Sequence, residues 1–288
     1  MTHEEMISSI YTHDTIYLPP SEENNAALEV ALGCSYGKCR FCDFAKDRFC
    51  IHSTEQIKKN MYLLGQLRPD AHRLFLLGEN AFVMGYEKLS EIFDMTDSYM
   101  PNIHEFSMYS RIDDIARKTD EELTSLHKMG LCTLHIGMES GSDSILTEQN
   151  KGFTSMDLIT QLKRLEKAGI EYYLTIILGL GGRHFSKLHA LETARVLNQL
   201  HPADIWCLKL KLWEGTPLYQ DAKKGLFDMM SDAEILWEEH ILLENLTVKD
   251  CMFHDTTALN LYTIQGRLPQ EKSSLLNAID MILSSHGY

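Results

Sequence analysis

Short apolar runs recur along the first two thirds of the chain, and segments with helical spacing separate them. In the segment from Met156 to Leu165, for example, apolar residues recur about every three residues, which indicates a helix. Strands that alternate with helices form parallel sheets. The pattern therefore predicts an α/β fold, a partial (β/α)6 TIM-like barrel. Its expected strands are Ala27–Gly33, Arg73–Gly78, Glu105–Ser110, Thr133–Met138, Tyr172–Leu178 and Asp204–Leu212.

The pattern changes after residue 212. We expect a turn at 214–219, an irregular polar stretch over 253–269 and a final helix from Gln270 to Ser284. Between them, Ser231–Leu246 is expected to be an amphipathic helix, with Ser231 and Glu234 forming a capping box. The polar segment around 17–25 is expected to be a loop. We predict one domain, 1–288, with a core of about 27–219 and a C-terminal extension of about 220–288 that closes the barrel mouth.

The amino-acid composition and net charge of the chain limit the classes of function that it can have. With 288 residues and 44% apolar positions, the chain can bury a sizeable core. Its formal net charge is −14 and no Lys/Arg block stands out, so a DNA or RNA duplex is disfavoured and a small-molecule substrate is favoured. The N-terminal residues lack the pattern of a signal peptide, and the apolar run near 172–180 is too short to span a bilayer. We therefore expect a soluble, cytoplasmic protein.

Three of the seven cysteines, Cys34, Cys39 and Cys42, follow the first expected strand with C-x4-C-x2-C spacing. Such clustering favours one local metal site over a disulfide framework. Thiolates suit an iron–sulfur cluster or zinc. A cluster normally takes four thiolates, so either Cys50 completes the set or one iron stays open for a substrate or cofactor. A zinc site completed by Cys50 or His52 is the alternative.

The cysteine segment, with the aromatic Phe41 before its last cysteine, resembles the signature of the radical S-adenosylmethionine (SAM) superfamily. The usual signature is C-x3-C-x2-C, so the extra residue after Cys34 is a departure. The segment Gly78–Asn80 is similar to the superfamily's Gly-Gly-Glu motif. Residues 137–141 and 214–219 resemble the Gly-Ile-Glu-Ser-Gly and Pro-Gly-Thr-Pro-Leu-Tyr runs of its Elp3/MiaB/NifB-like members. The ordered matches extend from about residue 28 to 219.

The resemblance implies a [4Fe–4S] cluster on Cys34, Cys39 and Cys42, with SAM as the second cofactor and a flavodoxin or ferredoxin-type protein as reductant. Such enzymes cleave SAM reductively to a 5′-deoxyadenosyl radical, which takes hydrogen from the substrate. The strand ends then bind the SAM ammonium, carboxylate, ribose and adenine in turn. The implied cofactor-binding residues are Phe41, Gly78, Glu79, Asn80, Ser110, Arg111, Glu139, Ile177, Leu178 and Gly179.

Ordinary structural roles compete with these assignments. Arg111 can clamp a carboxylate with paired hydrogen bonds, or it can form a surface salt bridge to Asp113 or Asp114. Glu139 can accept hydrogen bonds from ribose hydroxyls. The Gly-rich run at 179–182 lacks the phosphate-loop pattern, so it is either an adenine-packing segment or a simple strand-to-helix turn.

Lys209 and Lys211 share one face of the sixth expected strand, because strand side chains alternate. Either this face points into the barrel or the intervening leucines do. Lysines buried in the barrel need an anionic partner, which a substrate phosphate supplies. The polar tail is expected to fold over the mouth as a lid. The candidate substrate-binding residues are Lys209, Lys211, His254, Asp255, Asn260 and Tyr262.

The reaction itself is not encoded in a motif. Among short stand-alone members, the chain most resembles the queuosine-salvage lyases, which release queuine from a queuosine nucleotide by radical chemistry on the ribose. Another radical SAM reaction on a small molecule, of the porphyrin or cofactor-maturation type, is the enzymatic alternative. A non-enzymatic zinc or electron-transfer module is the third reading. No catalytic residue is assigned beyond the cluster and SAM sites.

Overall fold

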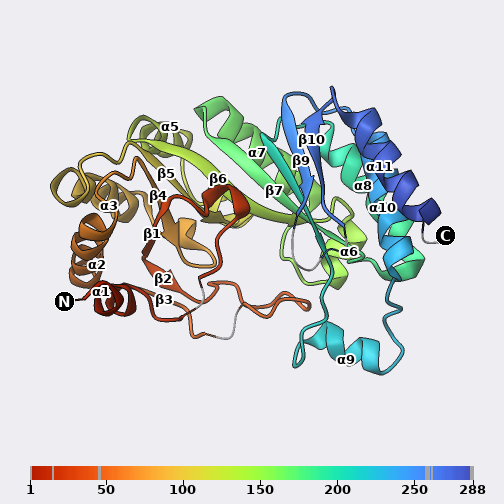
Figure 1. Ribbon diagram of the computed structural model, residues 1–288, viewed down its shortest axis with the longest axis horizontal. Coiled ribbons are helices and arrows are strands. Elements are labelled where there is room, and N and C mark those ends of the chain that lie inside the picture. Colours follow the sequence, from red (N-terminus) through yellow and green to blue (C-terminus); the bar gives the residue numbers. More distant parts are fainter. Residues whose placement is uncertain (1, 15, 45–46, 257–259, 261, 286–288) are drawn as a thin grey trace. The chain divides into compact units, whose positions relative to one another are not determined.

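A computed structural model describes residues 2–14, 16–44, 47–256, 260 and 262–285. Its main sheet contains eight strands in the order β1-β4-β5-β6-β7-β8-β9-β10 (Figure 1). The predicted α/β class, with helices between mostly parallel strands, is confirmed. The chain divides into two compact units. The first unit comprises 1–37, 44–135 and 167–171, and the second comprises 38–43, 136–166 and 172–288. Strand β6 (Leu131–Glu139) contributes to both.

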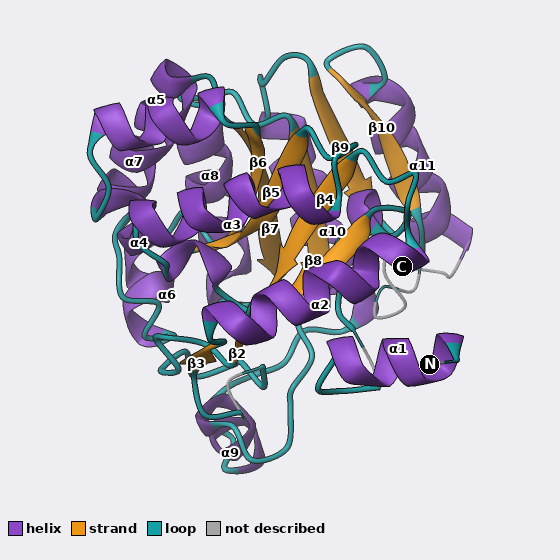
Figure 2. Cartoon of the chain, turned by 90° about the vertical axis from the view of Figure 1, so that its left-hand side faces the viewer, coloured by secondary structure: helices purple, strands orange, loops and turns teal. Residues whose placement is uncertain are grey.

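The first unit is built on the parallel strands β1 (Ala26–Glu29), β4 (Arg73–Leu77) and β5 (Glu105–Ser110). Helix α2 (Thr54–Leu67) packs on β1 and on α3 (Tyr86–Tyr99) (Figure 2). These strands are buried on both faces, as expected for a sheet that helices cover. The remaining elements are α1 (His3–Ile10), η1 (Pro20–Glu22), β2 (Ala31–Leu32), β3 (Cys50–Ile51), η2 (Ala81–Val83), α4 (Ile112–Ala116) and α5 (Asp120–Lys128).

The second unit contains the parallel strands β7 (Glu171–Leu178), β8 (Asp204–Lys209) and β9 (Cys251–Asp255). Strand β10 (Ile264–Leu268) pairs antiparallel with β9. Helix α10 (Asp232–Asn245) packs between α8 (Gly182–Leu197) and α11 (Lys272–Ser285) (Figure 1). Its other helices are α6 (Asp143–Glu148), α7 (Ser155–Ala168) and α9 (Pro217–Lys223).

The C-terminal part of the chain corrects two expectations. The stretch 253–269 is regular at both ends, because β9 and β10 form an antiparallel pair with Ile264 opposite Asp255. Its apolar residues Phe253, Ile264 and Leu268 are buried, which ties the pair to the core. The turn at 214–219 continues into helix α9, which begins at Pro217. Proline is well suited to the first helical position because it needs no hydrogen-bond acceptor there.

Several strand and helix boundaries also differ from the expectation. The first expected strand is split, and β2 pairs with β3 in a separate small sheet. The sixth strand ends at Lys209 instead of residue 212. The helix after Ser231 is confirmed, and Ser231 accepts from the Glu234 backbone N–H at 3.4 Å as its N-cap.

Glu22, within the expected loop, is fully buried in the first unit. One of its carboxylate oxygens lies 2.6 Å from Arg73 Nη2 and 2.9 Å from His135 Nε2. Burial alone raises a carboxyl pKa, but the hydrogen bonds from His135 and Arg73 outweigh it and lower the pKa of Glu22 to about 2. Glu22 therefore joins the segment before β1 to β4 and β6 through a buried ionic network.

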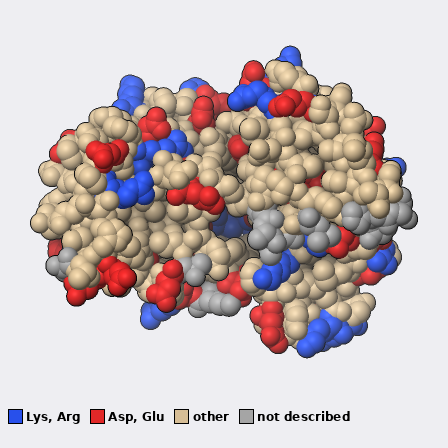
Figure 3. All heavy atoms as spheres, in the orientation of Figure 1, with Lys and Arg blue, Asp and Glu red and all other residues tan. Residues whose placement is uncertain are grey.

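Acidic and basic side chains are interspersed on the face of the molecule in Figure 3. Among the described residues, no helix combines the length and the apolar character that crossing a membrane requires.

Candidate functional site

Residues 34–42, which we call the cysteine loop, follow β2. All seven cysteines are thiols outside disulfides, and the three in this loop are half-buried. Cys42 N donates to the Cys39 carbonyl at 3.4 Å, so these two thiols flank one tight turn of the second unit, whereas Cys34 belongs to the first unit. Within the described ranges, no three His, Cys, Asp or Glu side chains gather as metal ligands. The donor chemistry, three thiols on one short loop, suits an iron–sulfur cluster.

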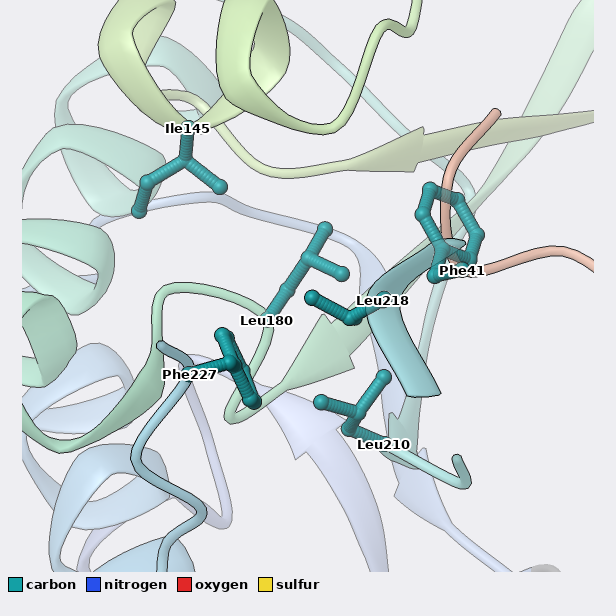
Figure 4. Close-up of a cluster of buried hydrophobic side chains, with 6 residues drawn as sticks. All are labelled: Phe41, Ile145, Leu180, Leu210, Leu218 and Phe227. Atoms are coloured by element: carbon teal, nitrogen blue, oxygen red, sulfur yellow. The ribbon is translucent and has the colours of Figure 1, made fainter. Parts of the chain in front are cut away.

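Phe41 anchors the second half of this loop in an apolar cluster (Figure 4). Cys39 and Cys42 pack against the same cluster. Leu218 N of α9 donates to the Arg40 carbonyl at 3.0 Å, and Arg40 also forms an ion pair with Asp221 of α9. Helix α9 therefore positions two of the three thiols. The buried cluster consists of Phe41, Ile145, Leu180, Leu210, Leu218 and Phe227.

In the first unit, the ends of β4 and β5 contact the first half of the cysteine loop. Asn80 is buried, and its amide Nδ2 donates to Ser35 Oγ at 2.7 Å. The Arg111 guanidinium lies over the Tyr36 ring, 4.0 Å from its centroid. Arg111 Nε also donates to Asp113 Oδ1 at 2.9 Å, so the alternative salt bridge exists. The Arg111 side chain in this ion pair is buried, at 7% exposure, so the pair is not a surface salt bridge.

Gly78, Glu79 and Ser110 are the other residues predicted at these two strand ends. Gly78 has a φ of +143°, and a side chain there would meet Ala31 at 3.0 Å. Burial raises the pKa of Glu79, whose Oε2 is buried without a hydrogen-bond partner in the described part of the chain. Ser110 Oγ donates to the carbonyl of Arg111 at 3.0 Å. Asn80 Oδ1 is likewise buried and without a donor among the described residues.

Glu139 ends β6 with a φ of +63°, an uncommon value for a residue other than glycine. Its Oε1 accepts from the buried Lys151 Nζ at 2.8 Å. Its Oε2 is buried, and no described residue hydrogen-bonds to it. A side chain at Gly137 would overlap the Glu139 carboxylate, which folds back along the strand. Glycine two residues before the acid therefore makes this orientation possible.

Lys151 was missing from the sequence predictions. It lies on the turn after α6, beside Gln149 and Asn150, whose backbone and side chain contact the second half of the cysteine loop. A lysine this deeply buried, at 7% exposure, requires an acidic partner. The sequence shows the lysine but not its burial, so only the fold identifies Glu139 as that partner.

At the end of β7, Ile177 and Leu178 lie on opposite faces of the sheet. Ile177 packs against the Phe41 cluster, while Leu178 is buried at 1% exposure. Gly179 has a φ of +82°, and its N–H donates to Glu238 Oε1 of α10 at 2.6 Å. The predicted adenine segment is therefore held partly by a residue far along the chain.

Four of the six predicted substrate residues line one small cavity of about 20 Å³ in the second unit. Lys209 Nζ forms an ion pair with Asp232 of α10, so the chain itself supplies an anionic partner. Asn260 Oδ1 accepts from Lys209 N at 2.8 Å and its Nδ2 donates to the Cys207 carbonyl at 3.0 Å, which caps the end of β8. The cavity is lined by Lys209, Asp232, Ile235, Leu236, Glu239, Asp255, Asn260 and Tyr262.

The other two predicted substrate residues lie elsewhere. The Lys211 ammonium lies over the Trp213 ring, 3.7 Å from its centroid. His254 precedes Asp255 on β9 and therefore faces the other side of the sheet. There it stacks on Trp206 and lies 2.8 Å from Asp204 Oδ1. Residues 257–259 and 261 of the expected lid lie outside the described residues.

Glu239 and Asp255 form a buried carboxyl pair beside the cavity, which the sequence analysis did not pair. Burial and the neighbouring Asp255 carboxyl raise the pKa of Glu239. Burial likewise raises the pKa of Asp255 to about 7. Neighbouring buried carboxyls avoid repulsion when one of them is protonated. The pair therefore retains a proton to a higher pH than two isolated carboxyls do.

The family model described as "Radical SAM superfamily" matches residues 28–195. An uncharacterized protein of Methanocaldococcus jannaschii is 26% identical over 234 residues, which cover 76% of this chain and 71% of that protein.

Solved structures share the fold at low sequence identity. The Elp3 protein of Methanocaldococcus infernus, with a deleted N-terminus, has a TM-score of 0.57 at 14% identity, and the match covers 91% of this chain and 64% of that one. Methylornithine synthase has a TM-score of 0.53 at 15% identity, with 78% and 64% covered. The chain thus spans slightly less than two thirds of these structures.

Proposed function

This chain belongs to the radical SAM superfamily, and from this premise we propose that it releases queuine from queuosine 5′-phosphate. A [4Fe–4S] cluster and SAM are the cofactors of the superfamily. When bound, they supply the 5′-deoxyadenosyl radical that takes hydrogen from the substrate. The chain's own residues must bind SAM and the substrate, orient both and exclude water.

We assign the cluster to Cys34, Cys39 and Cys42. The orphaned acceptors at the strand ends support the assignment of the SAM sites, because buried polar atoms without partners are uncommon and often mark a ligand. Asn80 Oδ1 suits the SAM ammonium, and Glu139 Oε2 suits a ribose hydroxyl.

The remaining SAM contacts follow from charge and shape. Arg111 provides a buried cation for the SAM carboxylate, and Lys151 is a second cation near Phe41, 5.9 Å from its ring centroid. Ile177 and the backbone around Gly179 offer an apolar surface to the adenine.

The main support for a nucleotide substrate is that four predicted substrate residues line one cavity. They are Lys209, Asp255, Asn260 and Tyr262. A cavity of about 20 Å³ holds about one water, so it accommodates only a polar tip of a ligand. In the proposed complex, the substrate phosphate replaces Asp232 as the partner of Lys209. Tyr262 and the carboxyl pair then lie near the rest of the nucleotide.

The test uses the anaerobically reconstituted full chain with SAM and a reductant. With queuosine 5′-phosphate, we expect free queuine and a rate of 5′-deoxyadenosine formation about tenfold above the rate without it. Guanosine 5′-phosphate should give neither. Equal 5′-deoxyadenosine with and without queuosine 5′-phosphate, and no queuine, would refute this substrate.

A pair of lysine variants tests the phosphate assignment. Lys209→Gln should raise the KM for queuosine 5′-phosphate at least about fivefold, because a charge-assisted contact to phosphate is lost. Lys211→Gln, whose ammonium lies over Trp213, is the matched control and should leave this KM within about twofold. Equal effects of the two substitutions would remove Lys209 from the phosphate site.

A further inference from the structure

One carboxylate of the C-terminal helix α10 contacts the end of β7 and, through a histidine, the end of β6. Glu238 is completely buried. Its Oε1 accepts from the Gly179 backbone N–H at 2.6 Å and lies 2.9 Å from His189 Nδ1 of α8. On its other side, His189 Nε2 lies 3.2 Å from the carbonyl oxygen of Glu139. All four residues belong to the second unit.

The partners of His189 determine its charge. A carbonyl oxygen only accepts hydrogen bonds, and so does an ionised carboxylate. With Glu238 ionised, both ring nitrogens donate, and His189 is then an imidazolium. Burial lowers the pKa of His189, but the Glu238 carboxylate outweighs burial and raises it. Among the described residues, the charged group that contacts the ring is Glu238 of α10, and the other ring nitrogen meets the backbone carbonyl of Glu139.

This network bonds to the backbone of two residues that have positive φ values. Glu139 has a φ of +63°, a conformation that residues with a side chain rarely adopt. Gly179 has a φ of +82°. The hydrogen bond to the Glu139 carbonyl holds the conformation from which its carboxylate turns back over Gly137. The hydrogen bond from Gly179 N holds the adjacent strand end in place.

We infer that Glu238 and His189 are positioning residues for SAM, acting through Glu139 and Gly179. This inference rests on the SAM assignment in the proposed function. Helix α10 then completes the SAM site, although it lies outside residues 28–195, which the family model matches. The ionic network sets where the ribose acceptor and the adenine surface lie relative to each other within the second unit.

The decisive variant is Glu238→Gln, which keeps the size and the acceptor for Gly179 N but removes the charge. In the cluster-reconstituted chain, we expect the Kd for SAM to rise about tenfold while the iron content stays the same. In the cofactor-free chain at about pH 8, ¹⁵N NMR should show His189 doubly protonated in the wild type and neutral in the variant.

Asp204→Asn is the matched control, because Asp204 is also a buried carboxylate beside a histidine, with Oδ1 2.8 Å from His254 Nε2, but lies at the start of β8. It should leave the Kd for SAM within about twofold. His189→Gln tests the same network if Glu238→Gln does not fold, and it should also weaken SAM binding about tenfold. The double variant should bind SAM no more weakly than the single variant with the larger effect, because both substitutions act through one network.

The outcomes separate the two proposals. A Glu238→Gln or His189→Gln chain that binds SAM within about twofold of the wild type overturns the positioning role alone. A neutral His189 in the wild type overturns the ionic network. A reconstituted wild-type chain that binds no SAM overturns the proposed function together with this inference.

Discussion

Replacing Glu22 by Gln should destabilise the protein strongly at neutral pH and much less in acid. Burial raises the pKa of this carboxyl, but its hydrogen bonds with His135 and Arg73 lower it from 4.5 to about 2. One pKa unit corresponds to about 1.4 kcal/mol, so the lowered pKa contributes roughly 3 kcal/mol to folding. Because the folded pKa is depressed, this contribution is present above pH 4.5 and disappears as the pH falls towards 2.

Urea unfolding at several pH values between about 7 and 3 measures this difference directly. At pH 7, the free energy of unfolding of Glu22→Gln should be roughly 3 kcal/mol below that of the wild type. This difference in free energy should decrease steadily below pH 4.5. Glu105→Gln is the control, because Glu105 pairs with the same Arg73 at 3.2 Å but is 56% exposed. An exposed pair contributes at most about 1 kcal/mol. A difference in the free energy of unfolding that does not depend on pH would contradict the electrostatic reasoning. An equal loss of stability in Glu22→Gln and Glu105→Gln would contradict it as well.

Three further outcomes are expected. Gly137→Ala overlaps the Glu139 carboxylate, so it should lower the free energy of unfolding by about 1–3 kcal/mol and weaken SAM binding. The control is Gly85→Ala, whose nearest neighbour would be 3.6 Å away, and equal urea midpoints for the two variants would contradict the overlap. The pKa of Asp255 is raised from 3.8 to about 7, so its stabilisation is present below pH 3.8 and is lost as the pH rises through about 7. Thermal melts should show this loss in the wild type and not in Asp255→Asn. Replacing all three thiols of the cysteine loop by Ala should abolish the uptake of about four irons per chain, whereas Cys50→Ala should retain it; iron analysis after anaerobic reconstitution decides.

Local sequence patterns were sufficient to predict those elements whose structure depends on residues that are close together in the chain. Strand β5 has the predicted limits Glu105–Ser110, because its apolar run is short and bounded. The helix after Ser231 was predicted from its capping box, in which residues three apart satisfy each other's backbone groups. The cysteine spacing and the strand-end motifs likewise predicted the superfamily that the family model matches over 28–195.

The hairpin of β9 and β10 depended on tertiary structure. Its strands include Gly266, Arg267 and His254, which do not form an apolar run. Strand β9 pairs with β10 and also with β8, which lies more than forty residues earlier in the chain, so no local sequence pattern predicts it. Because side chains alternate along a strand, His254 and Asp255 of β9 face opposite sides of the sheet, which separates two residues predicted to act together.

The ionic contacts of the site were decided only in three dimensions. The sequence identified Glu139, but its cation Lys151 and its backbone partner His189 become neighbours only when α6, α8 and β6 pack. Lys209 was predicted to need an anion, and the fold supplies Asp232 from α10. Charge pairing depends on burial and distance, and these follow from how distant segments pack rather than from residue type, so the sequence determined the chemistry available and the tertiary structure determined which groups meet.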